Sequence, residues 1–365
     1  METVLEINLT ALGDNVNYLR SKLVPGTLFL AVVKAFAYGN DSQTIARFLE
    51  NFGIDYFAVA YANEGVALRD AGITTPIMVL HPQASNLNTL IDRCLEPCLY
   101  SKFILEKFVS AAKKKDQKRY PVHINFNTGL NRLGFVEDDL NYLTHLLKNT
   151  PEIYAKSLFS HLASSEDLQE KDFTQHQIKS FKNIAAKFSA QSPNTPMLHL
   201  ANTSGILNYP EAHLNMVRSG IGMYGFGNDP EFDNYLKPIA TLKTGISQIH
   251  HLKKGDSLGY NRAFVAPKDM KTATLPLGHA DGIGRQYGNK KGFVTIQGAK
   301  AYIIGNVCMD MLMIDISEIN CKEGDEVIVF GPENSADTLA ATANTISYEI
   351  ITAISHRVKR VFSKD

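Results

Sequence analysis

Eight short apolar segments recur through the first 225 residues, and they constrain the fold more than any other feature of the sequence. Most are continuously apolar rather than alternating with polar residues, which is typical of strands buried on both faces in a parallel sheet. Helical patterns lie between them, as at 63–72 and 170–190. This alternation predicts an N-terminal (β/α)8 barrel, with a doubly wound open sheet as the alternative. The segments are LFLAVVKA (28–35), DYFAVA (55–60), PIMVL (76–80), CLYS (98–101), VHINFN (122–127), KSLFSHLA (156–163), MLHLA (197–201) and VRSGIGMYG (217–225).

The character of the sequence changes near residue 230. The segment YGFGNDPEFDNYLKP (224–238) is rich in glycine, asparagine, aspartate and proline, as expected at a domain boundary. Beyond it, β-like segments are separated by short turn signals such as KKGD and NKKG, and one helical pattern covers 337–355. We therefore predict a barrel domain at 1–230 and a mostly-β C-terminal domain at 231–365.

Charge and cysteine content exclude several classes of function. Lysine plus arginine and aspartate plus glutamate each total 37, so no net field attracts nucleic acid or an anionic membrane. Cys94 and Cys98 lie four residues apart, but no second pair completes a zinc site, and no metal is expected. The first residues lack the basic and apolar regions of a signal peptide, so none is expected there, and no apolar stretch has the length of a membrane span. These features predict a cytoplasmic protein.

Several polar side chains follow the predicted strands of the barrel. They are Lys34, Arg132, His161, His199 and Arg218. Active sites of (β/α)8 barrels lie at the C-terminal ends of the strands, so these side chains are expected to share one rim. Each alone would pass as an ordinary structural residue, but together they indicate a functional site.

Two segments near the end of the barrel sequence are suited to binding an anion. ANTSG (201–205) would open a helix with free N–H groups and the hydroxyl of Thr203, and RSGIG (218–222) offers unhindered glycine backbone. The overlapping GIGMYG matches a dinucleotide-binding pattern, but no clear helix follows it. A phosphate site near the strand-end Lys34 indicates pyridoxal phosphate, whose aldehyde forms a Schiff base with a lysine.

Taken together, motifs along nearly the whole chain resemble those of the alanine racemase family of fold-type III pyridoxal phosphate enzymes. The resemblance implies a (β/α)8 barrel followed by a β domain, with the first strand of the chain often packed onto the latter. It also implies a homodimer in which the C-terminal domain of each subunit completes the other's active site. The motifs, in the family's order, are AVVKAFAYG, ANEGVALRDAGITTPIMVL, NTGLNRLGF, LFSHLASS, HLANTSGIL, NMVRSGIGMYG, SLGYNRAF, LGHADG, NVCMDMLMID and YEIITAISHRV.

The resemblance also implies how pyridoxal phosphate is held. Lys34 would bind the aldehyde covalently, and Arg218 would face the pyridine nitrogen. His199 would support this arginine, while His161 would lie near the ring. The phosphate ligands implied by the family are Tyr38, Thr203, Gly220, Ile221 and Tyr348.

The catalytic roles implied by the resemblance follow from the symmetry of racemisation, which needs a base on each side of the substrate's Cα. Lys34 would serve D-alanine and Tyr260 of the partner subunit would serve L-alanine, in reactions supplying D-alanine for peptidoglycan. Arg132 and the backbone N–H of Met309 would bind the substrate carboxylate. The residues expected to line the entry channel are His279, Arg285 and Asp310.

The sequence departs from the family pattern at several positions. Phe36 replaces an asparagine, Asn40 and Asp41 replace His-Gly, and His279 replaces a tyrosine. Asn125 stands where many members have a lysine, and could still orient Arg132 by a hydrogen bond. These changes bear on substrate preference and rate, so a racemase of serine or of broad specificity stays open. The further alternatives are a fold-type III decarboxylase, a cofactor carrier without catalysis and an inactive racemase-like protein.

Overall fold

The computed structural model describes residues 2–192 and 194–364, which cluster into two compact units. We call residues 13–37 and 42–236 the barrel unit, and residues 1–12, 38–41 and 237–365 the β unit. The sequence analysis places one boundary near residue 230, whereas the contacts change at Lys237 and assign the N-terminal strand to the β unit. The reason is strand pairing: β1 (Val4–Asn8) lies antiparallel to β10 (Ala240–Gly245) and parallel to β19 (Lys359–Ser363).

The barrel unit contains a closed barrel of eight parallel strands, as the apolar segments predict. Pairing of the first of these strands with the last, with Leu30 opposite Arg218, closes the barrel. All four residues of the strand 56–59 are buried, which explains its uninterrupted apolar sequence. The strands are β2 (Leu28–Val32), β3 (Tyr56–Val59), β4 (Ile77–Val79), β5 (Glu96–Leu99), β6 (Tyr120–Asn125), β7 (Ile153–Phe159), β8 (Met197–His199) and β9 (Met216–Ser219).

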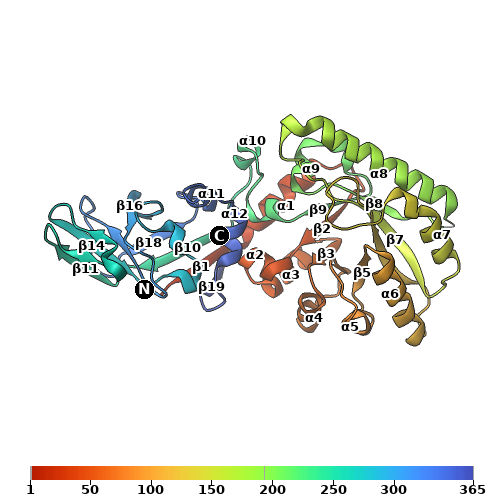
Figure 1. Cartoon of the computed structure of the whole chain (residues 1–365), viewed down its shortest axis with the longest axis horizontal. Helices are drawn as coiled ribbons and strands as arrows, with labels where there is room; N and C mark the ends of the chain where they lie inside the picture. Colours follow the sequence, from red (N-terminus) through yellow and green to blue (C-terminus); the bar gives the residue numbers. More distant parts are fainter. Residues whose placement is uncertain (1, 193, 365) are drawn as a thin grey trace. The chain divides into compact units, whose positions relative to one another are not determined.

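Helices alternate with these strands along the chain and pack around the barrel (Figure 1). In the helix 102–114, Ser101 caps the N-terminus by accepting a hydrogen bond from Ile104 N–H, and Leu105 and Phe108 are buried. The helices are α1 (Leu9–Ser21), α2 (Lys34–Gly39), α3 (Ser42–Asn51), α4 (Ala62–Asp70), α5 (Leu87–Asp92), α6 (Lys102–Lys114), α7 (Leu140–Lys148), α8 (Lys171–Gln191), α9 (Thr203–Asn208) and α10 (Pro230–Asp233). Short 3-10 turns are η1 (Glu137–Asp139), η2 (Leu168–Glu170), η3 (Pro210–Ala212) and η4 (Ile221–Tyr224).

The β unit is built on one mixed sheet with the strand order β11-β14-β17-β16-β15-β18-β10-β1-β19. Its remaining strands are β11 (Gln248–Leu252), β14 (Met270–Leu275), β15 (Phe293–Ile296), β16 (Ala299–Ile304), β17 (Leu312–Asp315) and β18 (Glu326–Phe330). A two-stranded ribbon, β12 (Ser257–Leu258) and β13 (Phe264–Val265), stands apart from this sheet. The 3-10 turns of this unit are η5 (Tyr260–Arg262), η6 (His279–Asp281) and η7 (Arg285–Tyr287).

The prediction of one helix over 337–355 is wrong. The structure has two helices there, α11 (Ala336–Ala341) and α12 (Ser347–Ala353). Asn344 between them has a φ of 54°, a left-handed conformation that ends a right-handed helix and that asparagine tolerates better than most residues. The Thr345 hydroxyl then donates to Glu349 in the next helix.

Candidate active site

Lys34 lies two residues after the last residue of the barrel strand β2 and begins a turn of unusual handedness. The φ angles of Ala35, Phe36, Ala37 and Tyr38 lie between 51° and 57°, so α2 turns in the left-handed sense. Left-handed backbone costs about 1–2 kcal/mol per non-glycine residue, and such strain is concentrated at functional sites. The chain therefore holds this turn in a strained conformation directly after the lysine that the sequence predicts to be catalytic.

Contacts within each unit hold this turn in place. In the barrel unit, one carboxylate oxygen of Glu64 accepts from Ala35 N–H at 2.7 Å, and the other accepts from Ala60 N–H at 2.7 Å. In the β unit, the Arg360 guanidinium donates to the Gly39 carbonyl at 2.9 and 3.1 Å. The sequence analysis did not identify Glu64 as a site residue. Its place three residues after Tyr61, where it accepts from Tyr61 N–H, is the helix-capping signal that could have revealed it.

Replacing Gly39 with alanine should destabilise the protein. Gly39 has a φ of 87°, and a Cβ atom there would lie 2.1 Å from the Ile351 carbonyl oxygen. We expect the free energy of unfolding to fall by about 2–5 kcal/mol, from left-handed strain and overpacking together. Gly26 is a matched control, because its φ is 89° but a Cβ atom there would have nothing within 4 Å. In urea denaturation Gly26→Ala should lose about 1–2 kcal/mol; equal losses in both variants would contradict the clash.

The environment of Lys34 makes its ammonium group easier to deprotonate. Burial lowers its pKa, and the positive charge of Arg132 lowers it further, while Glu64 acts weakly in the opposite direction. Since only the neutral amine is nucleophilic, a lowered pKa increases the fraction of Lys34 ready to attack a carbonyl near neutral pH.

Removing the charge of Arg132 should therefore shift the titration of Lys34. In Arg132→Gln the pKa of Lys34 is expected to rise, because one of the two causes that lower it is gone. The rate at which an amine-reactive reagent labels Lys34 in the cofactor-free protein should then increase at a higher pH than in the wild type. An unchanged pH profile would show that Arg132 does not act on Lys34.

Arg218, in strand β9, is the most heavily hydrogen-bonded charge in the barrel site. Its Nη1 donates to His199 Nδ1 at 2.9 Å, and its Nη2 donates to the Ser160 carbonyl at 2.7 Å. Nη2 also lies 3.1 Å from the Leu200 carbonyl and 3.2 Å from His161 Nδ1. Burial lowers the pKa of Arg218 to about 10, which still leaves the guanidinium positively charged at neutral pH.

The two histidines beside Arg218 are neutral. Burial, with the charges of Arg218, Arg132 and Lys34, lowers the pKa of His161 to about 3. Burial and Arg218 also hold the pKa of His199 well below its ordinary value. Since arginine can only donate, both imidazoles must present an unprotonated Nδ1 to it. Four of the predicted residues, Lys34, Arg132, His161 and Arg218, thus act on one another within the barrel unit.

The two predicted anion-binding segments lie together. Asn202 caps α9 by accepting from Gly205 N–H at 2.9 Å, and η4 begins at Ile221 directly after Gly220. Thr203 Oγ1 lies 3.2 Å from Ser219 Oγ and accepts from Gly222 N–H at 3.3 Å. Backbone N–H groups at the start of both segments and the threonine hydroxyl therefore gather at one end of the barrel, which suits a phosphate.

Tyr38 and Tyr348 meet inside the β unit, with their ring centroids 6.0 Å apart. Burial, followed by the proximity of Tyr348, raises the pKa of Tyr38 above its ordinary value. The Tyr38 phenol therefore keeps its proton at neutral pH and remains a hydrogen-bond donor, as a phosphate ligand must.

Tyr260 is the most exposed large hydrophobic side chain among the described residues, with 73% of its surface accessible. It opens η5, where Gly259, Asn261 and Arg262 all have positive φ angles of 50–72°. Behind this loop, Leu258 and Phe264 pack against a core cluster containing Ile304 and Met313. The loop is thus packed against this cluster, while the side chain of Tyr260 is exposed to solvent.

Met309 and Asp310 lie in a turn that contacts the η6 turn, which begins at His279. His279 N–H donates to the Cys308 carbonyl at 2.9 Å, and Ala280 N–H donates to the Met309 carbonyl at 3.0 Å. The two turns approach so closely that a Cβ on Gly278 would lie 2.3 Å from the Met309 carbonyl oxygen. Arg285, the third predicted entry-channel residue, opens the next turn, η7.

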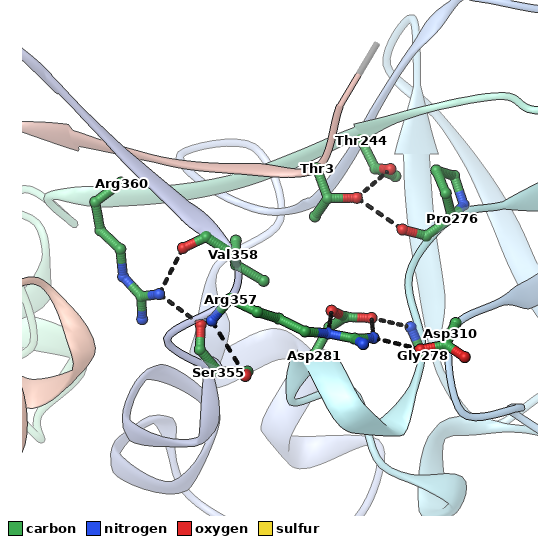
Figure 2. Close-up of polar contacts among 10 residues, drawn as sticks. All are labelled: Thr3, Thr244, Pro276, Gly278, Asp281, Asp310, Ser355, Arg357, Val358 and Arg360. Atoms are coloured by element: carbon green, nitrogen blue, oxygen red, sulfur yellow. Dashed lines mark hydrogen bonds and ion pairs between the residues drawn. The ribbon is translucent and has the colours of Figure 1, made fainter.

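An ion-pair network that the sequence analysis missed joins these turns. Figure 2 shows Arg357 between Asp281 and Asp310, with hydrogen bonds of 2.7 and 3.0 Å to the former and 2.7 Å to the latter. These bonds raise the pKa of Arg357. Asp281 is nearly fully buried and also accepts from Gly278 N–H at 2.8 Å. The sequence signal that could have revealed this network is the aspartate of the motif HADG, because an aspartate that is buried needs a cationic partner.

Comparisons with known proteins cover the whole chain. Residues 7–228 match the model of the alanine racemase N-terminal domain, and residues 239–362 match the model of the C-terminal domain. An alanine racemase from Clostridium tetani is 35% identical over 370 residues, covering 99% of this chain and 95% of that protein. One from Clostridium perfringens strain SM101 is 36% identical, with the same coverage of both chains.

Solved structures of alanine racemases are also similar to this chain over its full length. An alanine racemase structure from Clostridium difficile 630 superimposes with a TM-score of 0.94 and 31% identity, over 100% of this chain and 96% of that one. The alanine racemase of Bartonella henselae, solved with covalently bound pyridoxal phosphate, matches over 100% of both chains with a TM-score of 0.90 and 28% identity. The sequence motifs, the barrel with its β unit and these full-length similarities lead to one conclusion: the chain belongs to the alanine racemase family.

Proposed function

We propose that this protein interconverts L-alanine and D-alanine with pyridoxal phosphate as cofactor, using Lys34 and Tyr260 as its two bases. The observation that carries this proposal is the barrel site itself. A lysine with a lowered pKa follows β2, and a buried arginine at the end of β9 has its donors fixed by two neutral histidines. Full-length similarity to alanine racemases supports the choice of substrate.

The residues present fit pyridoxal phosphate. Lys34 offers an amine for the aldehyde, and the gathered N–H groups near Gly220 and Ile221, with the Thr203 hydroxyl, offer donors for a phosphate. We assign the protonated phenol of Tyr38 and the neighbouring phenol of Tyr348 to the same phosphate. When bound, the cofactor supplies an electron sink that lowers the cost of removing the proton from the substrate's Cα.

Arg218 is the residue that we place at the pyridine nitrogen. A carboxylate in this position would accept the ring proton and strengthen the electron sink, but a guanidinium has no lone pair to accept it. Arg218 should therefore disfavour protonation of the ring nitrogen. A weaker sink limits side reactions such as transamination, so the reaction is restricted to removing one proton from Cα and returning one.

Two bases on opposite sides of Cα then account for racemisation. We assign the D-enantiomer's proton to the amine of Lys34 and the L-enantiomer's proton to the phenol of Tyr260 of the partner subunit. Because a phenol in water ionises only near about pH 10, a phenolic base needs cations beside it, and we assign this role to Arg132 and to Arg218 with its partner His161. The exposure of Tyr260 in the single chain favours the homodimer that this arrangement requires.

The substrate carboxylate would bind to Arg132 and to the backbone N–H of Met309. Arginine recognises carboxylates through paired hydrogen bonds, and the η6 turn fixes the Met309 peptide. We place His279, Arg285 and Asp310 along the path by which the substrate enters. We also place the enzyme in the cytoplasm, where its D-alanine would supply peptidoglycan synthesis. In the part of the chain that the structure describes, no helix is long and apolar enough to span a bilayer.

A chiral assay tests the proposed reaction and substrate together. Purified protein with pyridoxal phosphate is incubated with single L-amino acids, including alanine, serine and a larger aliphatic residue. D-Alanine should form fastest, without release of carbon dioxide. Faster formation of another D-amino acid would change the substrate assignment, and carbon dioxide release without a D-product would replace the racemase by a decarboxylase.

A further inference from the structure

A chain of buried polar side chains crosses five neighbouring strands of the barrel, from β5 to β9. Its members are Glu96, His123, Ser157, His199 and Arg218, one from each strand, and none is more than 7% exposed. The strand registers place them on the same face of the sheet, because each lies level with its neighbour or two residues from that position. Polar groups buried so deeply are costly unless they are hydrogen-bonded to one another.

The chain of hydrogen bonds is continuous. Arg218 Nη1 lies 2.9 Å from His199 Nδ1, and His199 Nε2 lies 2.8 Å from Ser157 Oγ. Ser157 Oγ in turn lies 2.6 Å from His123 Nδ1, and His123 Nε2 lies 2.8 Å from Glu96 Oε2. The first residue of β5 is thereby connected to the arginine of the proposed cofactor site.

The two ends of this chain agree on the direction of every hydrogen bond. Arg218 only donates, so His199 accepts at Nδ1 and carries its proton on Nε2, which donates to Ser157. An ionised Glu96 only accepts, so His123 donates from Nε2, and a neutral His123 then accepts at Nδ1 from the Ser157 hydroxyl. Each atom along the path therefore has a donor or acceptor role that its functional group can fill.

Glu96 is well suited to anchor the chain as a carboxylate. Burial alone would raise its pKa, but the hydrogen bonds from His123 and Lys156 and the positive charge of Lys156 outweigh burial, and the pKa is lowered. Lys156 Nζ donates to the other carboxylate oxygen, Oε1, at 2.9 Å. The Tyr56 hydroxyl donates to Oε2 at 3.0 Å, and burial together with Glu96 raises the pKa of Tyr56, which keeps it protonated.

We propose that Glu96 is a positioning residue that acts on the cofactor site from within the barrel. Through His123 and Ser157 it holds His199 in the tautomer whose Nδ1 accepts from Arg218, and so fixes the guanidinium that faces the pyridine nitrogen. This inference rests on the proposed role of Arg218. The competing arrangement has His123 protonated on both nitrogens, in which case the Ser157 hydroxyl accepts from both rings and Glu96 has no influence on His199.

The wild-type holoenzyme gives the first test. Histidine-selective nitrogen NMR, with His123 and His199 assigned by single substitutions, should show both rings neutral and protonated on Nε2. A proton on Nδ1 of either ring, or a doubly protonated His123, would overturn the proposal. This reading needs no activity, so it distinguishes failure of the relay from failure of the proposed racemase function, and it stands even where a variant does not fold.

The variant Glu96→Gln tests the proposal by reversing the direction of the hydrogen bond between residue 96 and His123. The amide oxygen should stay beside the Lys156 cation, because the amide NH2 group would repel that charge. The NH2 group should then face His123 Nε2 and the Tyr56 hydroxyl, which can turn to accept from it. His123 must then move its proton to Nδ1, and the directed chain to Arg218 is broken. We expect the Nδ1 tautomer of His123 in the NMR spectrum and a loss of about 10–100-fold in kcat for alanine, with KM little changed, as for other residues that orient a functional group from behind.

Lys156→Met alone is the matched control, and the double variant tests whether the same substitution restores the function lost in Glu96→Gln. Alone, it removes a partner of Glu96 but leaves the carboxylate to accept from His123, so the tautomers and kcat should stay close to those of the wild type. Combined with Glu96→Gln, it frees the amide oxygen to turn toward His123 and should restore the Nε2 tautomer and most of kcat. A double variant no better than Glu96→Gln would show that Glu96 acts only through packing or stability.

Discussion

Replacing Lys34 with alanine is expected to abolish the visible absorbance of the lysine-bound cofactor and to reduce racemisation by more than about 10²–10⁴-fold, the loss typical of a single positioned base. The loss should exceed that range because the substitution removes both the covalent attachment point and one of the two bases. The measurement is an absorbance spectrum of the protein reconstituted with pyridoxal phosphate, followed by a chiral assay with each enantiomer of alanine.

A surface lysine provides the control for this experiment. Lys268 lies on the β unit with most of its side chain exposed, so Lys268→Ala should keep both absorbance and activity. Persistence of the visible absorbance in Lys34→Ala would mean that another amine binds the cofactor. In that case the strained turn after β2 would have no catalytic purpose.

Replacing Tyr260 with phenylalanine should separate the two faces of the reaction. The substitution removes the phenolic oxygen and little else, so proton removal from L-alanine should slow by about 10²–10⁴-fold. Proton removal from D-alanine by Lys34 should be much less affected. Exchange of the Cα hydrogen with deuterated solvent, followed separately for each enantiomer by NMR, measures the two steps.

Exchange is the required measurement because overall racemisation cannot reveal the asymmetry. Enantiomers have equal free energy in water, so the equilibrium constant is one and kcat/KM must fall equally in both directions. Tyr302→Phe, at a partly exposed tyrosine of the same unit, should leave both exchange rates unchanged. Equal slowing for L- and D-alanine in Tyr260→Phe would contradict the assignment of one base to each face.

The barrel could be predicted from sequence because its strands are buried on both faces. Each of the eight apolar segments contains or overlaps one observed strand, and the helical patterns 63–72 and 170–190 correspond to α4 and α8. Polar residues at the ends of such strands stand out against this background. That contrast is why Lys34 and Arg218 could be recognised as candidates from the sequence.

Other features depend on contacts that the local sequence does not encode. Ala35 to Tyr38 would be expected to turn in the right-handed sense, and only tertiary partners such as Glu64 hold them left-handed. Strand β19 depends on pairing with β1, more than 350 residues earlier in the chain. The link from Glu96 to Arg218 depends on the register of five strands, each of which adds one side chain.

Incubation of the wild-type holoenzyme with L-alanine in deuterated water tests the central claim most directly. The account predicts that D-alanine forms until the two enantiomers are equal, that the D-alanine produced carries deuterium at Cα, and that no carbon dioxide is released. L-Alanine that keeps its Cα hydrogen and its configuration, while the lysine-bound cofactor is visible in the absorbance spectrum, would contradict the claim that this protein is a two-base racemase of alanine.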